Sequence, residues 1–279
     1  MKMQQFDGKL RLLCDKSNPN EIMHSNEITH LYSLQDGGFL STSKDNTMIV
    51  WNGDDKKIFK NSGVTSICQL SDGLVATASK TIKIWNLDTG IETCIYNDNV
   101  ECLCSLSDNL SNGNLLSASD NIVKGWNYAT GKRTMTLGCN SAIYSMLQFE
   151  NILATQTSTC IQLWDLRSRK IVNNIYGNIY SMCKLQDNIL AIGSTYRIKL
   201  WDIRKGLLKE IKTYCSNNND SLYPLQDGRI LSTSDDTIYV WNMETEKCQT
   251  IHYQGDKVCQ LVDGRVIVAR KDYVIGVLI

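Results

Sequence analysis

This chain of 279 residues has few histidines, no excess of either charge and no long apolar run, and each of these features argues against a class of protein. The three histidines, His24, His30 and His252, fall at separate places, so the sequence suggests neither a Ser–His–Asp triad nor a histidine metal site. With 29 basic and 29 acidic residues the net charge is zero, which argues against general binding of nucleic acid or membrane surfaces. A glycine-rich phosphate loop is missing too, and we expect no cofactor.

Targeting and membrane-spanning segments are also missing. No apolar run approaches the roughly 20 residues of a membrane helix, and no charged-then-apolar leader precedes Phe6. The eleven cysteines are an odd number, so a secreted disulfide framework is not indicated. We therefore expect reduced thiols and a cytoplasmic protein, with the nucleus as the alternative.

A repeated β-hairpin fills most of the chain. In Gln226–Asn242, an Asp-Gly turn precedes a strand of small and apolar residues, a polar hairpin and a second strand that ends on tryptophan. Copies recur at intervals of about 40 residues, a period typical of stacked repeats. The six tryptophans all occupy the same slot: Trp51, Trp85, Trp126, Trp164, Trp201 and Trp241.

The pair that follows these strands gives the family resemblance. Trp-Asp occurs at Trp164-Asp165 and at Trp201-Asp202, and asparagine follows the other four tryptophans. The chain resembles the WD-repeat (WD40) β-propeller family over its whole length. The resemblance implies an all-β fold, a seven-bladed propeller of four-stranded antiparallel blades, in a single domain of residues 1–279. It also implies a monomeric, non-enzymatic scaffold that binds partner proteins or peptides.

A seventh copy lacks the tryptophan. The segment that begins at Asp263 repeats the one that begins at Asp227, and this alignment places Val277 at the tryptophan position. The chain then ends without a fourth strand. We expect residues 7–14 to supply that strand to the blade of residues 257–279, because pairing the chain ends removes open sheet edges.

The family's His–Ser–Trp–Asp network is implied for one blade. Only His24 can supply its histidine, and Asp45 lies two residues after the signature serine, Ser43. Asp236 stands in the same relation to Ser234, but without a histidine. Most blades are therefore expected to hold together by apolar packing.

Four cysteines share one position of the innermost strands: Cys68, Cys104, Cys183 and Cys259. A metal site is one interpretation of this column. Tyrosine and leucine occupy the same position in other copies and no histidine accompanies it, so we favour small buried apolar residues.

Two Trp-Asp-x-Arg motifs are candidate docking elements, comprising Trp164, Asp165 and Arg167, and Trp201, Asp202 and Arg204. They look like the box of WD-repeat substrate receptors that dock onto the damage-binding adaptor of cullin-type ubiquitin ligases. The resemblance implies that Arg167 and Arg204 make the docking contacts. The alternative is that arginine in this turn is merely solvated.

Cations in the middle hairpins are a second candidate site: Lys44, Lys80, Arg197, Arg270 and Lys271. Arg270 replaces the small serine found at this point of other copies, and a guanidinium can pair with a carboxylate or phosphate. We interpret the group as a surface for an acidic or phosphorylated partner segment. Ordinary solvated charge is the alternative.

A propeller enzyme that acts in the central channel is the remaining alternative. Asp108, Asp187 and Asp227 would then be its carboxylates. They follow innermost strands, however, in turns where aspartate commonly bonds its own backbone. We therefore expect no enzyme activity.

Overall fold

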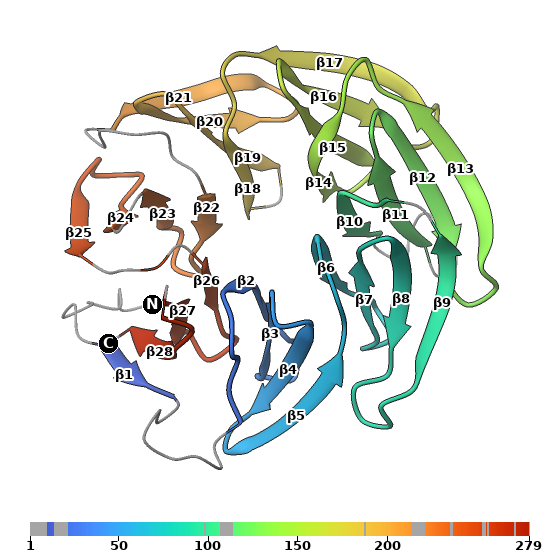
Figure 1. The fold of residues 1–279 in the computed structure, drawn as a ribbon. Helices are drawn as coiled ribbons and strands as arrows, with labels where there is room; N and C mark the ends of the chain where they lie inside the picture. The colour runs from blue at the N-terminus through green and yellow to red at the C-terminus, as the bar shows by residue number, and fades with distance from the viewer. Residues whose placement is uncertain are drawn as a thin grey trace. The chain divides into compact units, whose positions relative to one another are not determined.

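The computed structural model describes residues 10–13, 22–97, 99–106, 114–186, 188–213, 221–234, 237–252, 255, 257–270 and 272–278. Within these ranges the chain forms strands β1 to β28 and no helix, so nothing described there could cross a membrane as a helix. The strands assemble into seven four-stranded antiparallel sheets, called blades here and numbered in chain order (Figure 1). The predicted all-β fold of seven four-stranded blades is confirmed.

Four blades belong to a first compact unit, formed by Met1–Ser62 and Tyr180–Ile279. Blade one holds β2 (Ile28–Ser33), β3 (Phe39–Ser43), β4 (Thr47–Asn52) and β5 (Asp55–Lys60). Blade five holds β18 (Ser181–Gln186), β19 (Ile189–Ser194), β20 (Arg197–Asp202) and β21 (Gly206–Lys212). Blade six holds β22 (Ser221–Pro224), β23 (Ile230–Ser234), β24 (Thr237–Trp241) and β25 (Cys248–His252). Blade seven holds β26 (Lys257–Gln260), β27 (Val266–Ala269), β28 (Ile275–Leu278) and β1 (Leu10–Leu12).

Three blades belong to the second unit, Gly63–Ile179. Blade two holds β6 (Ser66–Gln69), β7 (Val75–Ala78), β8 (Thr81–Trp85) and β9 (Glu92–Asn97). Blade three holds β10 (Cys102–Ser105), β11 (Asn114–Ser119), β12 (Ile122–Asn127) and β13 (Lys132–Gly138). Blade four holds β14 (Ile143–Phe149), β15 (Ile152–Thr157), β16 (Cys160–Asp165) and β17 (Lys170–Tyr176).

Apolar packing joins neighbouring blades within each unit. In the first unit β2 contacts β26 and β18 contacts β22, while in the second β10 contacts both β6 and β14. Four tryptophans pack in a core shared with a neighbouring blade of the same unit: Trp51, Trp126, Trp164 and Trp241. Trp241, for example, packs with Cys183 and Ala191 of blade five. Burial of these alternating strand faces is the main stabilising contribution, at about 25 cal/mol for each Å² of apolar surface removed from water.

The N-terminal strand completes the last blade, as predicted. In blade seven the strand order is β1-β28-β27-β26, and Leu10, Arg11 and Leu12 pair with Leu278, Val277 and Gly276. Residues 7–9 and Cys14, which the sequence assigned to the same strand, lie outside the described residues.

The sequence placed Val277 at the tryptophan position of blade seven, and this prediction was wrong. Trp241 lies opposite Ile230 in blade six, and in blade seven Leu278 lies opposite Val266, the residue equivalent to Ile230. Leu278 therefore occupies the slot, and it packs in the core between blades six and seven. The cause is the hairpin after Arg270, which is one residue longer than its counterpart in blade six and shifts the alignment by one.

Candidate protein-interaction surfaces

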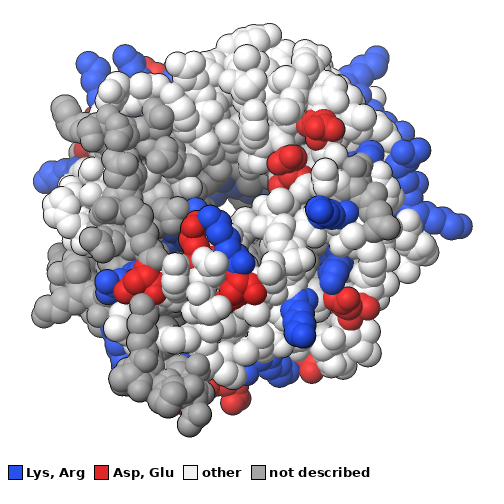
Figure 2. Space-filling model, viewed as in Figure 1, with Lys and Arg blue, Asp and Glu red and all other residues white. Residues whose placement is uncertain are grey.

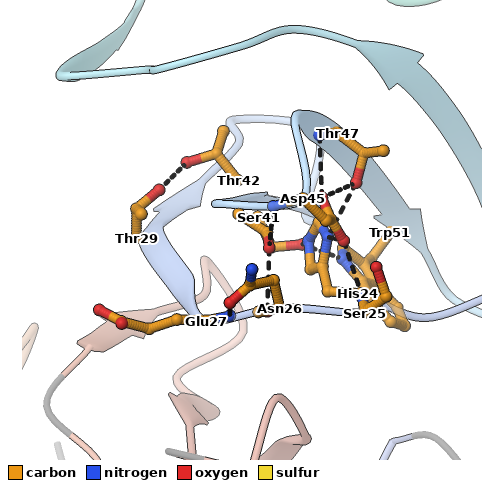
Figure 3. A network of polar contacts seen from close by, with 11 residues as sticks. His24, Ser25, Asn26, Glu27, Thr29, Ser41, Thr42, Asp45, Thr47 and Trp51 are labelled. Carbon is orange, nitrogen blue, oxygen red and sulfur yellow. Dashed lines mark hydrogen bonds and ion pairs between the residues drawn. The ribbon is translucent and has the colours of Figure 1, made fainter.

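A polar network in blade one begins at the tryptophan indole (Figure 3). Trp51 Nε1 donates to Ser41 Oγ at 2.8 Å, and Ser41 Oγ lies 2.8 Å from His24 Nε2. On the other side of the ring, His24 Nδ1 lies 3.2 Å from Asp45 Oδ2 and 2.9 Å from Thr47 Oγ1. The predicted roles of His24, Trp51 and Asp45 are confirmed.

The neighbours of His24 assign its tautomer. Ser41 accepts from the indole and can donate its own hydrogen to Nε2, while Nδ1–H faces the carboxylate of Asp45. A neutral ring therefore satisfies every partner. Burial is the largest effect on His24 and holds its pKa below the ordinary value, although Asp45 opposes that shift. Desolvation acts to raise the pKa of Asp45, but hydrogen bonds from Thr47 and the Ser25 backbone, together with the interaction with His24, lower it below the ordinary value.

The serine predicted for this network was wrong. Ser41, not Ser43, accepts the indole hydrogen; Ser43 Oγ instead donates to the Asn26 carbonyl and accepts from the Asp45 backbone. Ser41 and Ser43 share one face of β3, but Ser41 is only two residues from Phe39, which pairs with Trp51, and so lies nearer to the indole than Ser43 does. Four other indoles donate to the equivalent hydroxyl groups: Thr77, Ser117, Thr155 and Ser232.

Blade five departs from this pattern. Leu190 pairs with Trp201, so the equivalent position two residues on is Ile192, which offers no acceptor. The indole nitrogen of Trp201 is buried and has no hydrogen-bond partner among the residues that the structure describes. This departure can be found in the sequence by aligning the residues that face each tryptophan.

The two Trp-Asp-x-Arg motifs form turns that hold their arginines outward. Asp165 accepts from the Ser168 backbone at 2.6 Å, and Asp202 accepts from the Arg204 backbone at 2.8 Å. These backbone hydrogen bonds are the largest cause of the lowered pKa of each carboxyl group. Arg167 and Arg204 are both exposed, and they belong to different units.

Most of the candidate cations of the middle hairpins are paired with acids. Lys44 Nζ lies 2.6 Å from Glu27, Arg197 forms an ion pair with Glu210, and Arg270 Nε lies 3.2 Å from Asp272. Lys80 is exposed and has no ionic partner within the described ranges, and Lys271 lies outside them. Acidic and basic side chains are interspersed over the face shown in Figure 2. The local ion pairs offset much of the positive charge that the sequence pattern suggested.

Comparison with known proteins gives the same architecture. Residues 20–52, which contain the network of blade one, match the family model described as "WD domain, G-beta repeat". The structure also resembles the one titled "Crystal structure of WD40 beta propeller domain of Doa1", with a TM-score of 0.75 and 21% sequence identity. That match covers 91% of this chain and 93% of the Doa1 chain. The chain has the fold of a WD40 β-propeller. A search of curated protein sequences finds no match.

One of the three aspartates considered for a channel enzyme lies within the described residues. Of the channel aspartates, Asp227 is held by Arg229, with Nη2 2.7 Å from Oδ2, while Asp108 and Asp187 lie outside the described residues. Within the described ranges, no cluster of three histidine, cysteine or carboxylate side chains could hold a metal ion.

The cysteine column of the propeller is buried. Cys68, Cys104, Cys183 and Cys259 are all buried, and none of them forms a disulfide within the described residues. Burial raises the thiol pKa of Cys68, and it raises those of Cys183 and Cys259 to about 12. Thiols with such pKa values react slowly at neutral pH, in agreement with a packing role.

Proposed function

We propose that this propeller is a substrate-receptor scaffold that docks the adaptor of a cullin-type ubiquitin ligase through its two Trp-Asp-x-Arg turns. One observation carries the proposal. In both turns the aspartate is used by backbone N–H groups of its own turn, and the arginine beside it is exposed.

The turns suit docking for a physical reason. A capped turn has few conformations, so presenting Arg167 and Arg204 costs little additional backbone entropy on binding. A guanidinium donates two parallel hydrogen bonds to a carboxylate, which gives strong and directional contacts with an acidic partner surface. In blade six Glu244 stands at the position of the motif's arginine, and Glu246 follows it. The motif is therefore not a general property of the blades.

The test is co-purification of the damage-binding adaptor with tagged protein from cells. The Arg167→Ala/Arg204→Ala variant is expected to lose the adaptor and to melt at the wild-type temperature, because both side chains are exposed. The matched control is Arg133→Ala/Lys247→Ala, which removes the same charge from exposed positions on other blades. We expect this control to retain the adaptor.

Two results would contradict the proposal. One is wild-type protein that brings down no adaptor. The other is equal loss of adaptor in the control variant, which would indicate that net charge rather than the motif governs the contact.

An acidic or phosphorylated partner segment at the middle hairpins is the second candidate. Exposed Lys80 supports it, while Arg270 would have to exchange Asp272 for the partner's anion. Binding of such a segment should weaken above physiological salt, where the screening length is roughly 8 Å. Arg270→Glu/Lys271→Glu is expected to weaken it further, and unchanged binding at low and high salt would contradict this candidate.

A further inference from the structure

Blades five and six enclose a cleft of about 420 Å³, which lies entirely in the first unit. The residues that carry its apolar wall are Leu185, Ile189, Leu200, Leu208 and Met243. Its volume is within the range of about 300 to 1,000 Å³ that is typical of ligand pockets.

The other copies of the repeat show that this opening is a local departure. Leu185 and Leu200 are only half-buried, although their counterparts in other blades are buried. For Leu185 the buried counterparts are Leu34, Leu70, Leu106, Phe149, Leu225 and Leu261. For Leu200 they include Ile84, Leu163 and Val240.

A change in the first turn of blade five accounts for Leu185. Blades one, two, six and seven turn through Asp-Gly, with the glycine at positive φ: Gly37, Gly73, Gly228 and Gly264. Blade five has Asn188 instead, and β18 runs on so that Gln186 pairs with Ile189. Because Lys184 pairs with Leu190, Leu185 becomes the extra residue of a bulge, and bulges redirect side chains.

A second bulge, which blades three and four share at the same position, places Leu208 at the rim. Leu200 pairs with Lys209 and Trp201 with Leu207, which leaves Leu208 as the extra residue, 52% exposed. The bulge in β18 and this recurrent bulge in β21 thus bring leucines to the same cleft.

The charges of the cleft favour one class of occupant. Arg229 is buried and already bound to Asp227, with Nε 2.9 Å and Nη2 2.7 Å from the carboxylate. Lys209 is held across the junction by Glu246 and by the Met243 carbonyl. Glu244 is exposed and has no ionic partner within the part of the chain that the structure describes, so it is the charge available at the cleft.

We propose that this cleft binds an extended segment of a partner protein that inserts an aliphatic side chain next to a lysine or arginine. The aliphatic group lies between Leu185, Leu200 and Leu208, and the cation faces Glu244. Neither the Trp-Asp-x-Arg turns nor the ligase proposal is needed for this binding.

The test is methyl NMR of the full chain, labelled at leucine, isoleucine and methionine, with the synthetic peptide Ac-Ala-Lys-Leu-Ala-amide as the probe. Saturable shifts are expected at Leu185, Leu200, Leu208 and Met243, with an affinity in the millimolar range appropriate to so short a ligand. Ac-Ala-Glu-Leu-Ala-amide and Ac-Ala-Lys-Asn-Ala-amide are expected to bind at least about fivefold more weakly.

Two variants locate the contact. Leu208→Asn should weaken binding at least about fivefold, whereas Leu207→Asn should leave it unchanged. Leu207 is a close control because it is 51% exposed and adjacent in sequence, yet does not line the cleft. Glu244→Gln should remove the preference for lysine over glutamate in the peptide.

Several outcomes would overturn the proposal. They are an absence of saturable shifts, equal binding of the asparagine peptide, a preference for the glutamate peptide, or equal effects of Leu207→Asn and Leu208→Asn. Concentration-dependent dimerisation in sedimentation that Leu208→Asn abolishes would instead identify a second copy of the chain as the occupant.

Discussion

Blades one and five have the same order of four paired strands, but they differ in the polar groups around the buried tryptophan. In blade one Ser41 links the indole of Trp51 to His24, whereas in blade five Ile192 leaves the indole of Trp201 without an acceptor. A buried donor that loses its partner costs about 1 to 3 kcal/mol. Blade five nevertheless retains all three antiparallel strand pairings, with a bulge in two of them. Strand pairing and apolar burial therefore suffice to form a blade, and the network is an additional source of stability.

The largest effect on stability is expected from removing β1, because blade one shares a core with the blade that this strand completes. Leu13 packs on the core shared by blades seven and one, which contains Trp51, and β1 covers the edge of β28. Deleting residues 1–14 should therefore lower the melting temperature by about 10 °C and promote aggregation. In hydrogen exchange, blade one should lose protection before blade five. Cooperative melting within a degree or two of the full-length chain would show that this strand does not stabilise the fold.

The same substitution in both blades tests the comparison directly. Trp51→Phe removes the donor to Ser41 and disturbs a satisfied buried network, while Trp201→Phe removes a donor that has no partner. After allowance for the similar loss of ring area, Trp51→Phe should destabilise by about 1 to 2 kcal/mol more than Trp201→Phe. Urea unfolding of the two variants provides the measurement. Equal costs would mean that the network contributes no net stability.

Much of this comparison could be predicted from the sequence, and its errors have identifiable causes. The spacing of the tryptophans gave the blades, and the lack of histidine limited the complete network to blade one. Ser43 was predicted for the network because of its spacing from Asp45, and the sequence does not show that Ser41, on the same strand face, lies nearer to the indole. Val277 was predicted at the position that Leu278 occupies, because a constant offset between blades six and seven does not allow for one additional hairpin residue.

The candidate surfaces were less predictable, because they depend on side chains that are distant in sequence. Glu27 neutralises Lys44 and Glu210 neutralises Arg197, and neither pairing follows from the repeat. The cleft beside Leu208 depends on two bulges, and the repeat pattern does not show where a strand contains an extra residue.

A smaller effect is expected from pH, and between pH 6.5 and 5 we expect it to come from His24 in blade one. The pKa of His24 in the folded protein lies below the ordinary value of 6.5, so the unfolded chain takes up a proton first as the pH falls. Stability that is present at neutral pH is therefore lost below about 6.5, with a slope of at most about 1.4 kcal/mol per pH unit. Asp45, whose pKa is also lowered, adds a second loss only below about pH 4.

The comparison of wild type with His24→Gln isolates this contribution. The variant should lack the loss of unfolding free energy between pH 6.5 and 5, when urea unfolding is measured at each pH. Hydrogen exchange should place the wild-type loss in β3 rather than in β19. An identical pH dependence in the variant would exclude His24 as its source.

The smallest effect is expected from giving blade five the acceptor that it lacks. Ile192→Thr keeps a β-branched side chain in a fully buried strand position and places a hydroxyl two residues from the partner of Trp201, as Thr155 does in blade four. The lost apolar volume costs about 1 kcal/mol, and the new hydrogen bond to a buried donor returns a similar amount. We therefore expect a net change in the free energy of unfolding within about 0.5 kcal/mol.

Ile192→Val, which makes the same reduction in size without a hydroxyl, should be the less stable of the two. The indole N–H resonance of Trp201 should shift in the threonine variant alone. If the valine variant is the more stable and the indole resonance does not move, the unpartnered indole imposes no cost that a hydroxyl can recover.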